Sequence, residues 1–440
     1  MNSISHRLFS SVIMTIAAVL ASVAQTIEHP KLGTSTQSHG GLKLTLEHRL
    51  QNWNYTEKAT LNKNIISPKS VNIHPDGSKL YINSLEGALT VVVDARTYDE
   101  LAVIRHRFDA SDSLLWAPAS GYYPFTHYTE RLNTFTGKPV ESVFSHNGRF
   151  LRIPYYRRSF DLNAQDPSAL AVIDTRTDKI VRVFEAGVLP KMIAVNPSST
   201  RIAIAHWGDN TVGYLDCEGA DPAKWHHLKP YVVDHQIKWD LSLTKPVNRD
   251  EGSGNALRGT AFTPDGRYLL VACMGGMGGI AVIDTRTENG LYLGKLYGMM
   301  PNVRHIIFSN DDLYMSVNKS GYVQRIKSAD LDKAIEALAT GGKRRHTIAA
   351  ACFDNAKVGT GARTLVASPK GRFIFVACNY NNSVDVVDTK TMKRVASLPA
   401  DSYPVGMDIS ADGTKLYVTS QGRKDKVPSG NCVDIIEIDY

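Results

Sequence analysis

The stretch Arg258–Gly266, R-G-T-A-F-T-P-D-G, decides the fold of this chain, because close copies of it recur along the sequence. Each copy begins with a cation or a valine, continues as a short apolar run and ends in a polar turn. The other copies begin at Lys69 (K-S-V-N-I-H-P-D-G), Val140 (V-E-S-V-F-S-H-N-G), Lys191 (K-M-I-A-V-N-P-S-S), Arg304 (R-H-I-I-F-S-N-D-D), Arg363 (R-T-L-V-A-S-P-K-G) and Val405 (V-G-M-D-I-S-A-D-G). A strand unit that recurs seven times predicts a ring of seven blades.

Each copy is followed by two more stretches typical of strands. The second stretch is rich in β-branched and aromatic residues, as in R-Y-L-L-V-A-C after Gly266. The third stretch ends on an aspartate, at Asp94, Asp174, Asp284 or Asp388. An aspartate in this position accepts a hydrogen bond from the backbone two residues later, so we interpret these four as turn residues, not catalytic ones.

The repeated phrases resemble those of the YVTN family of β-propellers. The resemblance is carried by K-L-Y-I-N (Lys79–Asn83), K-L-Y-V-T (Lys415–Thr419) and N-N-S-V-D-V-V-D-T-K-T (Asn381–Thr391), and it extends over roughly residues 41–440. It implies the propeller fold. It does not imply one function, because such propellers serve as scaffolds, binders and enzymes.

The two ends of the chain predict how the ring closes. The last unit supplies strands at 405–410, 415–420 and 432–438, one strand fewer than a full blade. The stretch Leu42–Leu50, L-K-L-T-L-E-H-R-L, alternates apolar and polar residues as a strand does. Pairing it with the last blade removes two exposed sheet edges. We therefore predict an all-β chain, one domain over 25–440, folded as a seven-bladed β-propeller whose last blade is closed by an N-terminal strand.

Residues 1–24 are typical of a signal peptide. His6 and Arg7 precede the apolar run Leu8–Leu20, and Ser22-Val23-Ala24 offers small residues at a cleavage site. No later segment reaches the length that a membrane span needs. We therefore expect a periplasmic or secreted protein, in which disulfides are permitted. The sequence contains five cysteines: Cys217, Cys273, Cys352, Cys378 and Cys432. Their number is odd and none forms C-x-x-C, so their pairing stays open; Cys273 and Cys378 end equivalent strands and are interpreted as buried packing residues.

Irregular segments interrupt the repeat near 108–138, 154–168, 217–256 and 329–361. The loop that enters each first strand and the loop between the second and third strands share one face of a propeller. The segments expected on that face are 108–138, 154–168, about 237–256, about 352–361 and 421–430, and the repeated cations point there too. Asp330–Ala339 has the pattern of a helix and is expected on the opposite face, where the other connections are mostly short turns. Long loops on a rigid scaffold are where binding usually resides.

The repeated cation is the strongest indication of function. Five like charges that meet near one axis repel one another by several kcal/mol even at an effective dielectric near ~20. They therefore need internal carboxylates, for which Glu141 and Asp209 are candidates, or a bound anion. The overall formal charge of +7 is only a mild excess, so the clustering matters more.

The leading hypothesis is a binding module without catalytic residues, metal or cofactor, because no G-x-S-x-G, P-loop or H-E-x-x-H sequence occurs. The expected partner is an anionic small molecule or a polyanion (saccharide or nucleic acid), bound by a monomer, with a protein partner possible. The alternatives are a lactonase-type or acidic-saccharide lyase enzyme, with His206, His127 or a tyrosine as base, and a protein-assembly scaffold. The predicted ligand-binding residues are Lys69, Lys191, Arg258, Arg304, Arg363, Tyr155, Arg157, His206, Trp207 and Tyr380.

Overall fold

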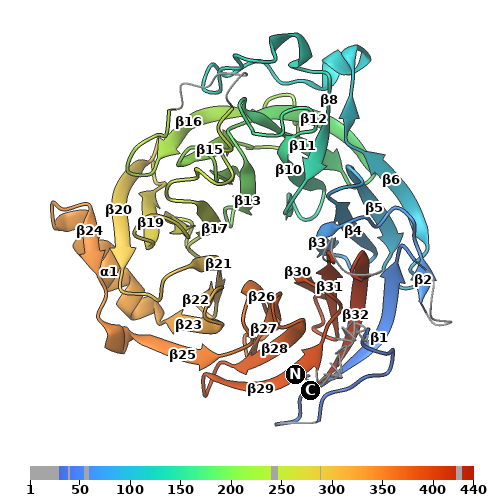
Figure 1. Ribbon diagram of the computed structural model, residues 1–440. Coiled ribbons are helices and arrows are strands. Elements are labelled where there is room, and N and C mark those ends of the chain that lie inside the picture. Colours follow the sequence, from blue (N-terminus) through green and yellow to red (C-terminus); the bar gives the residue numbers. More distant parts are fainter. Residues whose placement is uncertain (1–28, 38–39, 54–58, 239–245, 288, 423–428) are drawn as a thin grey trace, which may run out of the picture.

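Seven sheets of mainly antiparallel strands surround a central axis in the computed structural model, which describes residues 29–37, 40–53, 59–238, 246–287, 289–422 and 429–440 (Figure 1). The predicted signal peptide, 1–24, lies outside the described residues. The inner strand of each blade comes first in its unit, as the repeat predicts. These inner strands are β3 (Pro68–Ile73), β9 (Val143–Ser145), β13 (Pro190–Val195), β17 (Leu257–Phe262), β21 (Val303–Ser309), β26 (Ala362–Ala367) and β30 (Pro404–Ile409).

The outer strands follow in chain order within each blade. Blade one contains β4 (Lys79–Ser84), β5 (Leu89–Asp94) and β6 (Glu100–Arg105); blade two β10 (Phe150–Arg158), β11 (Ser168–Asp174) and β12 (Lys179–Ala186); blade three β14 (Arg201–His206), β15 (Thr211–Asp216) and β16 (His226–Val232); blade four β18 (Tyr268–Cys273), β19 (Ile280–Asp284) and β20 (Leu291–Tyr297). Blade five contains β22 (Asp312–Val317), β23 (Tyr322–Ile326) and β25 (Phe353–Lys357); blade six β27 (Phe373–Cys378), β28 (Ser383–Asp388) and β29 (Lys393–Pro399); blade seven β31 (Lys415–Ser420), β32 (Cys432–Asp439) and β1 (Lys43–Gln51).

The N-terminal strand closes the ring, which confirms the predicted closure. Strand β1 pairs antiparallel with β32, from Lys43 opposite Asp439 to Gln51 opposite Cys432. Figure 1 shows this first strand lying beside the last one. The backbone groups of β32 are thereby paired on both sides, since β31 occupies its other edge.

The hydrophobic core lies between adjacent blades. Along β18, Leu269 and Val271 pack with residues of blade three, while Leu270 and Ala272 pack with residues of blade five. Successive side chains of a strand point to opposite faces of its sheet, so every apolar strand contributes to two interblade layers. This explains why the second and third strands are apolar runs without polar alternation.

The aspartate turns form as predicted. The Oδ1 atoms of Asp94, Asp174, Asp284 and Asp388 accept hydrogen bonds from the backbone N–H two residues later, over distances of 2.8, 3.1, 3.1 and 2.8 Å. Cys273 and Cys378 are buried packing residues, as expected, and all five cysteines are free thiols.

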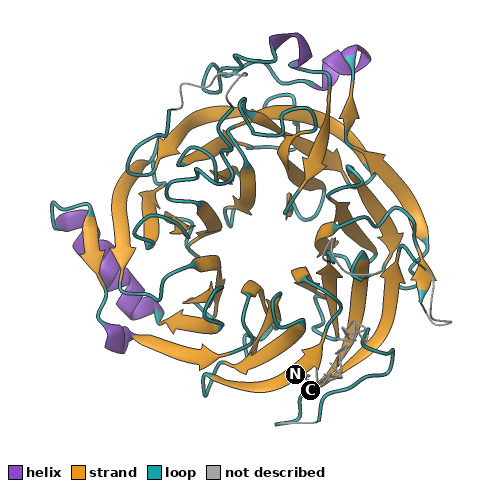
Figure 2. Cartoon of the chain, viewed as in Figure 1, coloured by secondary structure: helices purple, strands orange, loops and turns teal. Residues whose placement is uncertain are grey.

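Among the described residues, four further short strands and four helical segments add to the ring, and the helices lie on its periphery (Figure 2). Helix α1 (Ser328–Thr340) confirms the predicted helix and lies beside β24 (Arg345–Thr347), which adds to blade four. The other short strands are β2 (Thr60–Leu61), β7 (Arg107–Phe108) and β8 (Phe135–Pro139), and the 3-10 helices are η1 (Ala110–Leu115), η2 (Thr129–Arg131) and η3 (Ala350–Cys352). No helix in the described part of the chain is long and apolar enough to cross a membrane.

Three insertions hydrogen-bond to one another, which places them on one face. Gln165 donates from Nε2 to the carbonyl of Val247 over 2.8 Å, and the N–H of Arg249 donates to the carbonyl of Asn163 over 3.3 Å. The carboxylate of Asp166 accepts from the N–H of Thr126, over 2.9 Å, and from the two N–H groups that follow it. Segments 108–138, 154–168 and 246–256 therefore form one layer, here called the insertion layer.

A buried ion pair fastens the closing strand. The guanidinium of Arg49 on β1 donates from Nε to Oδ1 of Asp434 on β32 over 2.5 Å, and its Nη1 lies 3.5 Å from Oδ2 of Asp401. All three side chains are buried. Removing one member of such a pair leaves the other charge without a partner in the interior, which is strongly destabilising.

We predict that Arg49→Ala lowers the free energy of unfolding by about 3–5 kcal/mol, because Asp434 loses its buried partner. Urea denaturation followed by circular dichroism measures the change. Glu47→Ala on the same strand is the matched control, since Glu47 forms a half-exposed ion pair with Lys415 at 3.2 Å and such pairs contribute about 0–1 kcal/mol. Equal effects of the two substitutions would contradict the proposed role of Arg49.

Candidate anion site at the channel mouth

The five repeated cations occupy one structural position. Each is the second residue of an innermost strand: Lys69 in β3, Lys191 in β13, Arg258 in β17, Arg304 in β21 and Arg363 in β26. Figure 1 shows these strands arranged around the central axis. Equivalent positions on inner strands lie at the same height along the axis, so the sequence repeat becomes a ring of charge.

The charges act on one another. Arg363, Glu141, Arg258 and Arg304 all contribute to the electrostatic environment of Lys69, and Asp250, Arg258 and Glu141 contribute to that of Lys191. Lys69, Arg258 and Arg363 are only 4–7% exposed. We call the five cations together with Glu141 and Asp250 the cation cluster.

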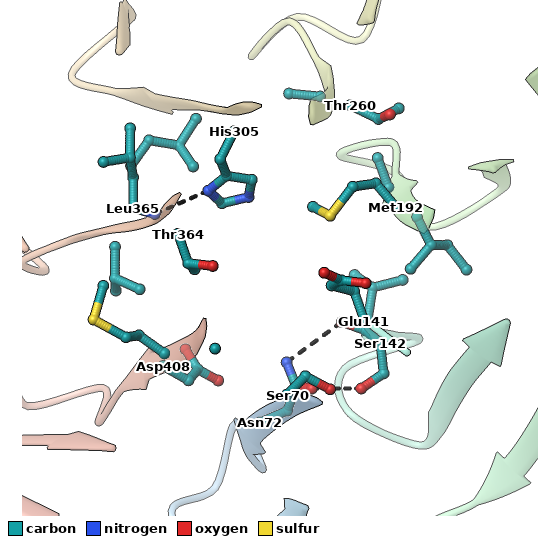
Figure 3. A pocket seen from close by; sticks show the side chains of 18 of the residues that line it. Ser70, Asn72, Glu141, Ser142, Met192, Thr260, His305, Thr364, Leu365 and Asp408 are labelled. Atoms are coloured by element: carbon teal, nitrogen blue, oxygen red, sulfur yellow. Dashed lines mark hydrogen bonds between the residues drawn. The ribbon is translucent and has the colours of Figure 1, made fainter. Parts of the chain in front are cut away.

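The cation cluster caps a channel of about 470 Å³. All seven blades line this channel, and the wall begins one or two residues after the cation position: residues 70–72, 141–143, 192–195, 260–262, 305–308, 364–367 and 406–408. Figure 3 shows the polar side chains of the wall, among them Ser70, Ser142, Thr260, Thr364 and Asp408. The channel therefore has a charged end and a wall of mixed polarity.

Glu141 is the internal partner of two cations. Its Oε1 atom accepts a hydrogen bond from Nη2 of Arg258 over 2.7 Å and lies 3.5 Å from Nζ of Lys69. Burial disfavours ionisation of this carboxyl, but the charges of Arg258, Lys69 and Arg363 outweigh burial and lower its pKa to about 2. The prediction that Glu141 pairs with the ring is confirmed, whereas Asp209, the other candidate, instead accepts from Oγ1 of Thr211 over 2.7 Å.

Asp250, in the insertion layer, is the partner of Lys191. Its Oδ1 atom lies 3.0 Å from the Lys191 ammonium, and its Oδ2 atom accepts from the hydroxyl of Tyr156. The ammonium also lies 3.8 Å from the ring centroid of Tyr156 and 5.1 Å from that of Trp207. Burial lowers the pKa of Lys191 to about 7, although the Asp250 charge acts against that decrease.

Arg304 and Arg363 have no carboxylate within ion-pair distance among the described residues. Arg363 lies 6.0 Å from the ring centroid of Tyr403, and Nε of Arg304 is buried without a hydrogen-bond partner in the described part of the chain. Burial and the neighbouring guanidinium groups lower the pKa of both, that of Arg363 to about 10. Five cations and two carboxylates leave a formal excess of three positive charges in the cluster.

The remaining predicted ligand contacts divide into two groups. Trp207 donates from Nε1 to the carbonyl of Asp250 over 2.9 Å, Arg157 lies 5.3 Å from the ring centroid of Tyr156, and Tyr380 is 52% exposed near Arg363. These three surround the cation cluster. The other two, Tyr155 and His206, do not.

Tyr155 and His206 are completely buried, which corrects their assignment as ligand contacts. The hydroxyl of Tyr155 shares a hydrogen bond of 2.9 Å with Nδ1 of His106, and its ring packs against Phe108 and Phe135 inside blade two. His206 accepts from the N–H of Gly187 over 3.0 Å and bonds Thr211 over 2.8 Å, so both ring nitrogens are used. The neighbouring Tyr156 and Trp207 face the site instead, because successive side chains of a strand alternate in direction.

Two residues of the site carry no signal in the repeat. Asp250 belongs to an insertion, and Tyr403 precedes an inner strand at a position where the other copies have no aromatic residue. Alternation along β10 indicates that only one of the adjacent residues Tyr155 and Tyr156 can face the site, but it does not say which one. Asp250 could not have been found this way.

Two titratable groups lie along the channel wall below the cluster. Nδ1 of His305 accepts a hydrogen bond from the N–H of Leu365 over 3.0 Å, shown as a dashed line in Figure 3, and burial lowers its pKa to about 4. The carboxyl of Asp408 accepts from the N–H groups of Ile73 and Ile409, and burial raises its pKa to about 7. Within the described ranges, no cluster of three or more His, Cys, Asp or Glu residues could hold a metal ion.

Comparison with known proteins supports the fold. Neither a family model nor a curated protein matches the chain, so the YVTN resemblance stays a prediction. A structure of hydrazine synthase from Kuenenia stuttgartiensis is similar with a TM-score of 0.54 and 14% identity, covering 87% of this chain and 99% of that one. A β-propeller domain from Myceliophteria thermophila is similar with a TM-score of 0.54 and 12% identity, covering 84% and 96%.

A chain of a mitotic checkpoint complex is similar as well, with a TM-score of 0.53 and 10% identity, covering 86% of this chain and 92% of that one. At such identities the likeness establishes the fold alone. The class of protein is therefore a seven-bladed β-propeller, and its function must be argued from the cation cluster and the loops around it.

We predict that Glu141→Gln lowers the free energy of unfolding by about 3–5 kcal/mol at low ionic strength, because the cations lose their central partner. Sodium sulfate should restore more stability to this variant than sodium chloride of equal ionic strength does, since a divalent oxyanion can replace the carboxylate. Glu86→Gln is the control, because Glu86 pairs with Lys138 at the surface at 2.7 Å. Thermal denaturation in the two salts measures the difference.

The pH dependence follows from the lowered pKa of Glu141. A carboxyl whose folded pKa is about 2, below its ordinary value of 4.5, binds fewer protons in the native state than in the unfolded state. Its stabilising contribution is complete above about pH 4.5 and disappears as the pH falls through 2. The difference in stability between the parent and Glu141→Gln should therefore shrink in that window, and a constant difference would contradict it.

Proposed function

We propose that this chain is an exported β-propeller binding module that holds an anionic ligand at the mouth of its central channel. The observation that carries the proposal is the formal excess of three positive charges in the buried cation cluster. Buried charges are normally paired, because removing an ion from water costs several kcal/mol. A bound anion would supply the missing partner.

The two guanidinium groups without carboxylate partners determine which anion fits. Arg304 and Arg363 come from adjacent blades, and the charge of Arg363 contributes to the lowered pKa of Arg304. A guanidinium is planar and donates two parallel hydrogen bonds to the oxygens of a carboxylate, phosphate or sulfate. We infer that one such group of the ligand lies between these two arginines.

The surroundings of the cluster favour entry of one charged group over side-on binding of a polyanion. Lys69, Arg258 and Arg363 are almost fully buried, so a ligand reaches them only by inserting an end. Tyr380, which is half-exposed, and Trp207 lie around the cluster and offer aromatic faces to the rest of the ligand. The proposed ligand is therefore a small molecule or chain end that carries a carboxylate, phosphate or sulfate.

Binding is preferred over the enzymatic alternatives on one observation. His206, the first candidate base for a lactonase or a lyase, is enclosed and uses both ring nitrogens in structural hydrogen bonds. A general base has to reach the proton that it removes. Export by residues 1–24 and membership of the YVTN family are proposals that rest on the sequence alone.

The variant with Arg304→Gln and Arg363→Gln tests the proposal directly. We expect sulfate, phosphate and citrate to raise the melting temperature of the parent, and the double variant to lose at least about tenfold in affinity for each, since two charged hydrogen-bonding groups are removed. Isothermal titration calorimetry measures the affinities. Arg267→Gln and Arg286→Gln, combined in one control, remove the same charge from exposed turns.

An unchanged affinity of the double variant would overturn the proposal, and so would an equal loss in the control. The parent's affinity should also fall as sodium chloride rises, because a charged ligand competes with other ions for the cluster. A salt-independent affinity would show that the cations do not hold the ligand.

Anion binding should also be accompanied by proton uptake near pH 8. Burial and nearby cations lower the pKa of Lys69 and Lys191, the latter to about 7, so at pH 8 Lys191 is mostly neutral. An anion in contact with the cluster raises both pKa values, and protons then bind. Titrations with sulfate in Tris and in HEPES should differ in their heats in proportion to the buffers' ionisation enthalpies, and identical heats would contradict proton uptake.

A further inference from the structure

The wall of the central channel is built in levels, because the repeat gives the inner strands a common register. The five cations mark the upper level, at the first position of their copies. Three residues further along each copy lies a second set of channel-lining residues, here called the lower level. It consists of Asn72, Val143, Ala194, Ala261, Ile307, Val366 and Asp408. A strand rises about 3.3 Å per residue, so the lower level lies roughly 10 Å from the cation position along the strands.

Asp408 carries the only charge of the lower level, since five of the other six residues are apolar and Asn72 is neutral. Its Oδ2 atom accepts from the N–H of Ile73 and its Oδ1 atom from the N–H of Ile409, both over 2.9 Å. No cation in the described part of the chain lies within ion-pair distance of this carboxylate. Burial raises its pKa to about 7, and the two backbone hydrogen bonds offset that increase only in part. Asp408 is thus a channel-lining carboxylate without a counter-charge.

Asn72 lies beside Asp408 on the channel wall (Figure 3). The two residues come from blades one and seven, and the bond from the N–H of Ile73 to Asp408 joins the inner strands of these blades. Ser142 holds the amide of Asn72, because its hydroxyl donates to Oδ1 over 2.5 Å and its carbonyl accepts from Nδ2 over 3.4 Å. One lone pair of Oδ1 remains for another donor. The lower level therefore presents a carboxylate and a fixed amide side by side.

A donor group with a positive charge suits these two side chains best. A carboxylate removed from water needs a cation as its partner, and both side chains have oxygen atoms that accept hydrogen bonds. One carboxylate and one amide are too few ligands for Ca²⁺ or Mg²⁺, which take about six or more oxygen atoms. A primary ammonium group carries one charge and three N–H donors, so a single group serves both side chains. The apolar residues of the lower level favour a methylene chain next to it.

We propose that the ligand of the channel is dipolar, with an anionic group at one end and a primary ammonium group at the other. The anionic group lies between Arg304 and Arg363, and the ammonium group lies against Asp408 and Asn72. An ω-amino acid with a chain of methylene groups is the simplest such molecule. This inference rests on the proposed anion site and adds the class of ligand and the lower half of its site. The channel, of about 470 Å³, has room for such a molecule.

Calorimetry on the whole folded protein compares 8-aminooctanoate, 8-hydroxyoctanoate, octanoate and sulfate. We expect 8-aminooctanoate to bind at least about tenfold more tightly than octanoate or 8-hydroxyoctanoate, because only its ammonium group pairs with the charge of Asp408. Glycine is the short control and should gain nothing over acetate, since its two charges are too close together to reach both levels. The proposal is overturned if 8-aminooctanoate binds no more tightly than the other two eight-carbon acids.

The variant Asp408→Asn removes the charge and keeps the shape of the side chain. It should lose at least about tenfold in affinity for 8-aminooctanoate and retain the parent's affinity for octanoate and sulfate. Retained sulfate binding also shows that the variant is folded. Asp265→Asn is the matched control, because it removes a carboxylate from an exposed turn, and it should leave every affinity unchanged. A full preference for 8-aminooctanoate in folded Asp408→Asn would refute the role of Asp408.

The anion site and the ammonium site fail in different ways in this design. The variant with Arg304→Gln and Arg363→Gln should weaken the binding of sulfate and of all three eight-carbon acids. If the parent binds neither sulfate nor octanoate, the proposed function itself is wrong. If both bind through the two arginines and the ammonium group brings no gain, only the dipolar ligand is wrong. If Asp408→Asn does not fold, the comparison of the three eight-carbon acids in the parent decides alone.

Discussion

The pairing of β1 with β32 is the constraint on which the rest of this structure depends. It joins the two ends of the chain across the last blade, so the seven sheets form a closed ring instead of an open stack. Closure brings the innermost strands to one axis. Residues more than a hundred positions apart in sequence, such as Glu141 and Arg258, then lie within hydrogen-bond distance. The buried pair of Arg49 with Asp434 stabilises the same junction.

The ring of charge is a consequence of this symmetry. A cation at one position of the repeat is harmless in a single blade, but five copies around a narrow axis repel one another. The chain offsets part of this repulsion in two ways. Glu141, which directly follows the repeat position occupied by Val140, forms an ion pair with Arg258. Asp250 of the insertion layer forms an ion pair with Lys191. Two of the three uncompensated charges are on blades five and six, at Arg304 and Arg363, and the third arises because Lys69 and Arg258 share Glu141.

The insertion layer separates two environments with different chemistry. The side chains of Arg249 and Asp250 are adjacent in sequence but have different surroundings. Arg249 lines a second cavity, of about 400 Å³, together with Gln165 and Asp209, whereas Asp250 belongs to the cation cluster. The cluster has a formal excess of positive charge, whereas three carboxylates, those of Asp209, Asp161 and Asp166, act on the guanidinium of Arg249.

The sequence by itself determined the blade number, the strand that closes the ring, the helix expected over 330–339 and the cation position, because all of these follow from a repeat or from local periodicity. It also identified Glu141, which stands one residue after a repeat position. Only the tertiary structure decided which aromatic residues reach the site. Tyr155 and His206 enter the core. The sequence could not show this, because the face to which each residue of a bulged strand points is known only once the neighbouring strands are in place. Asp250 and the second cavity depend on how three insertions fold over one another, and no repeat encodes that arrangement.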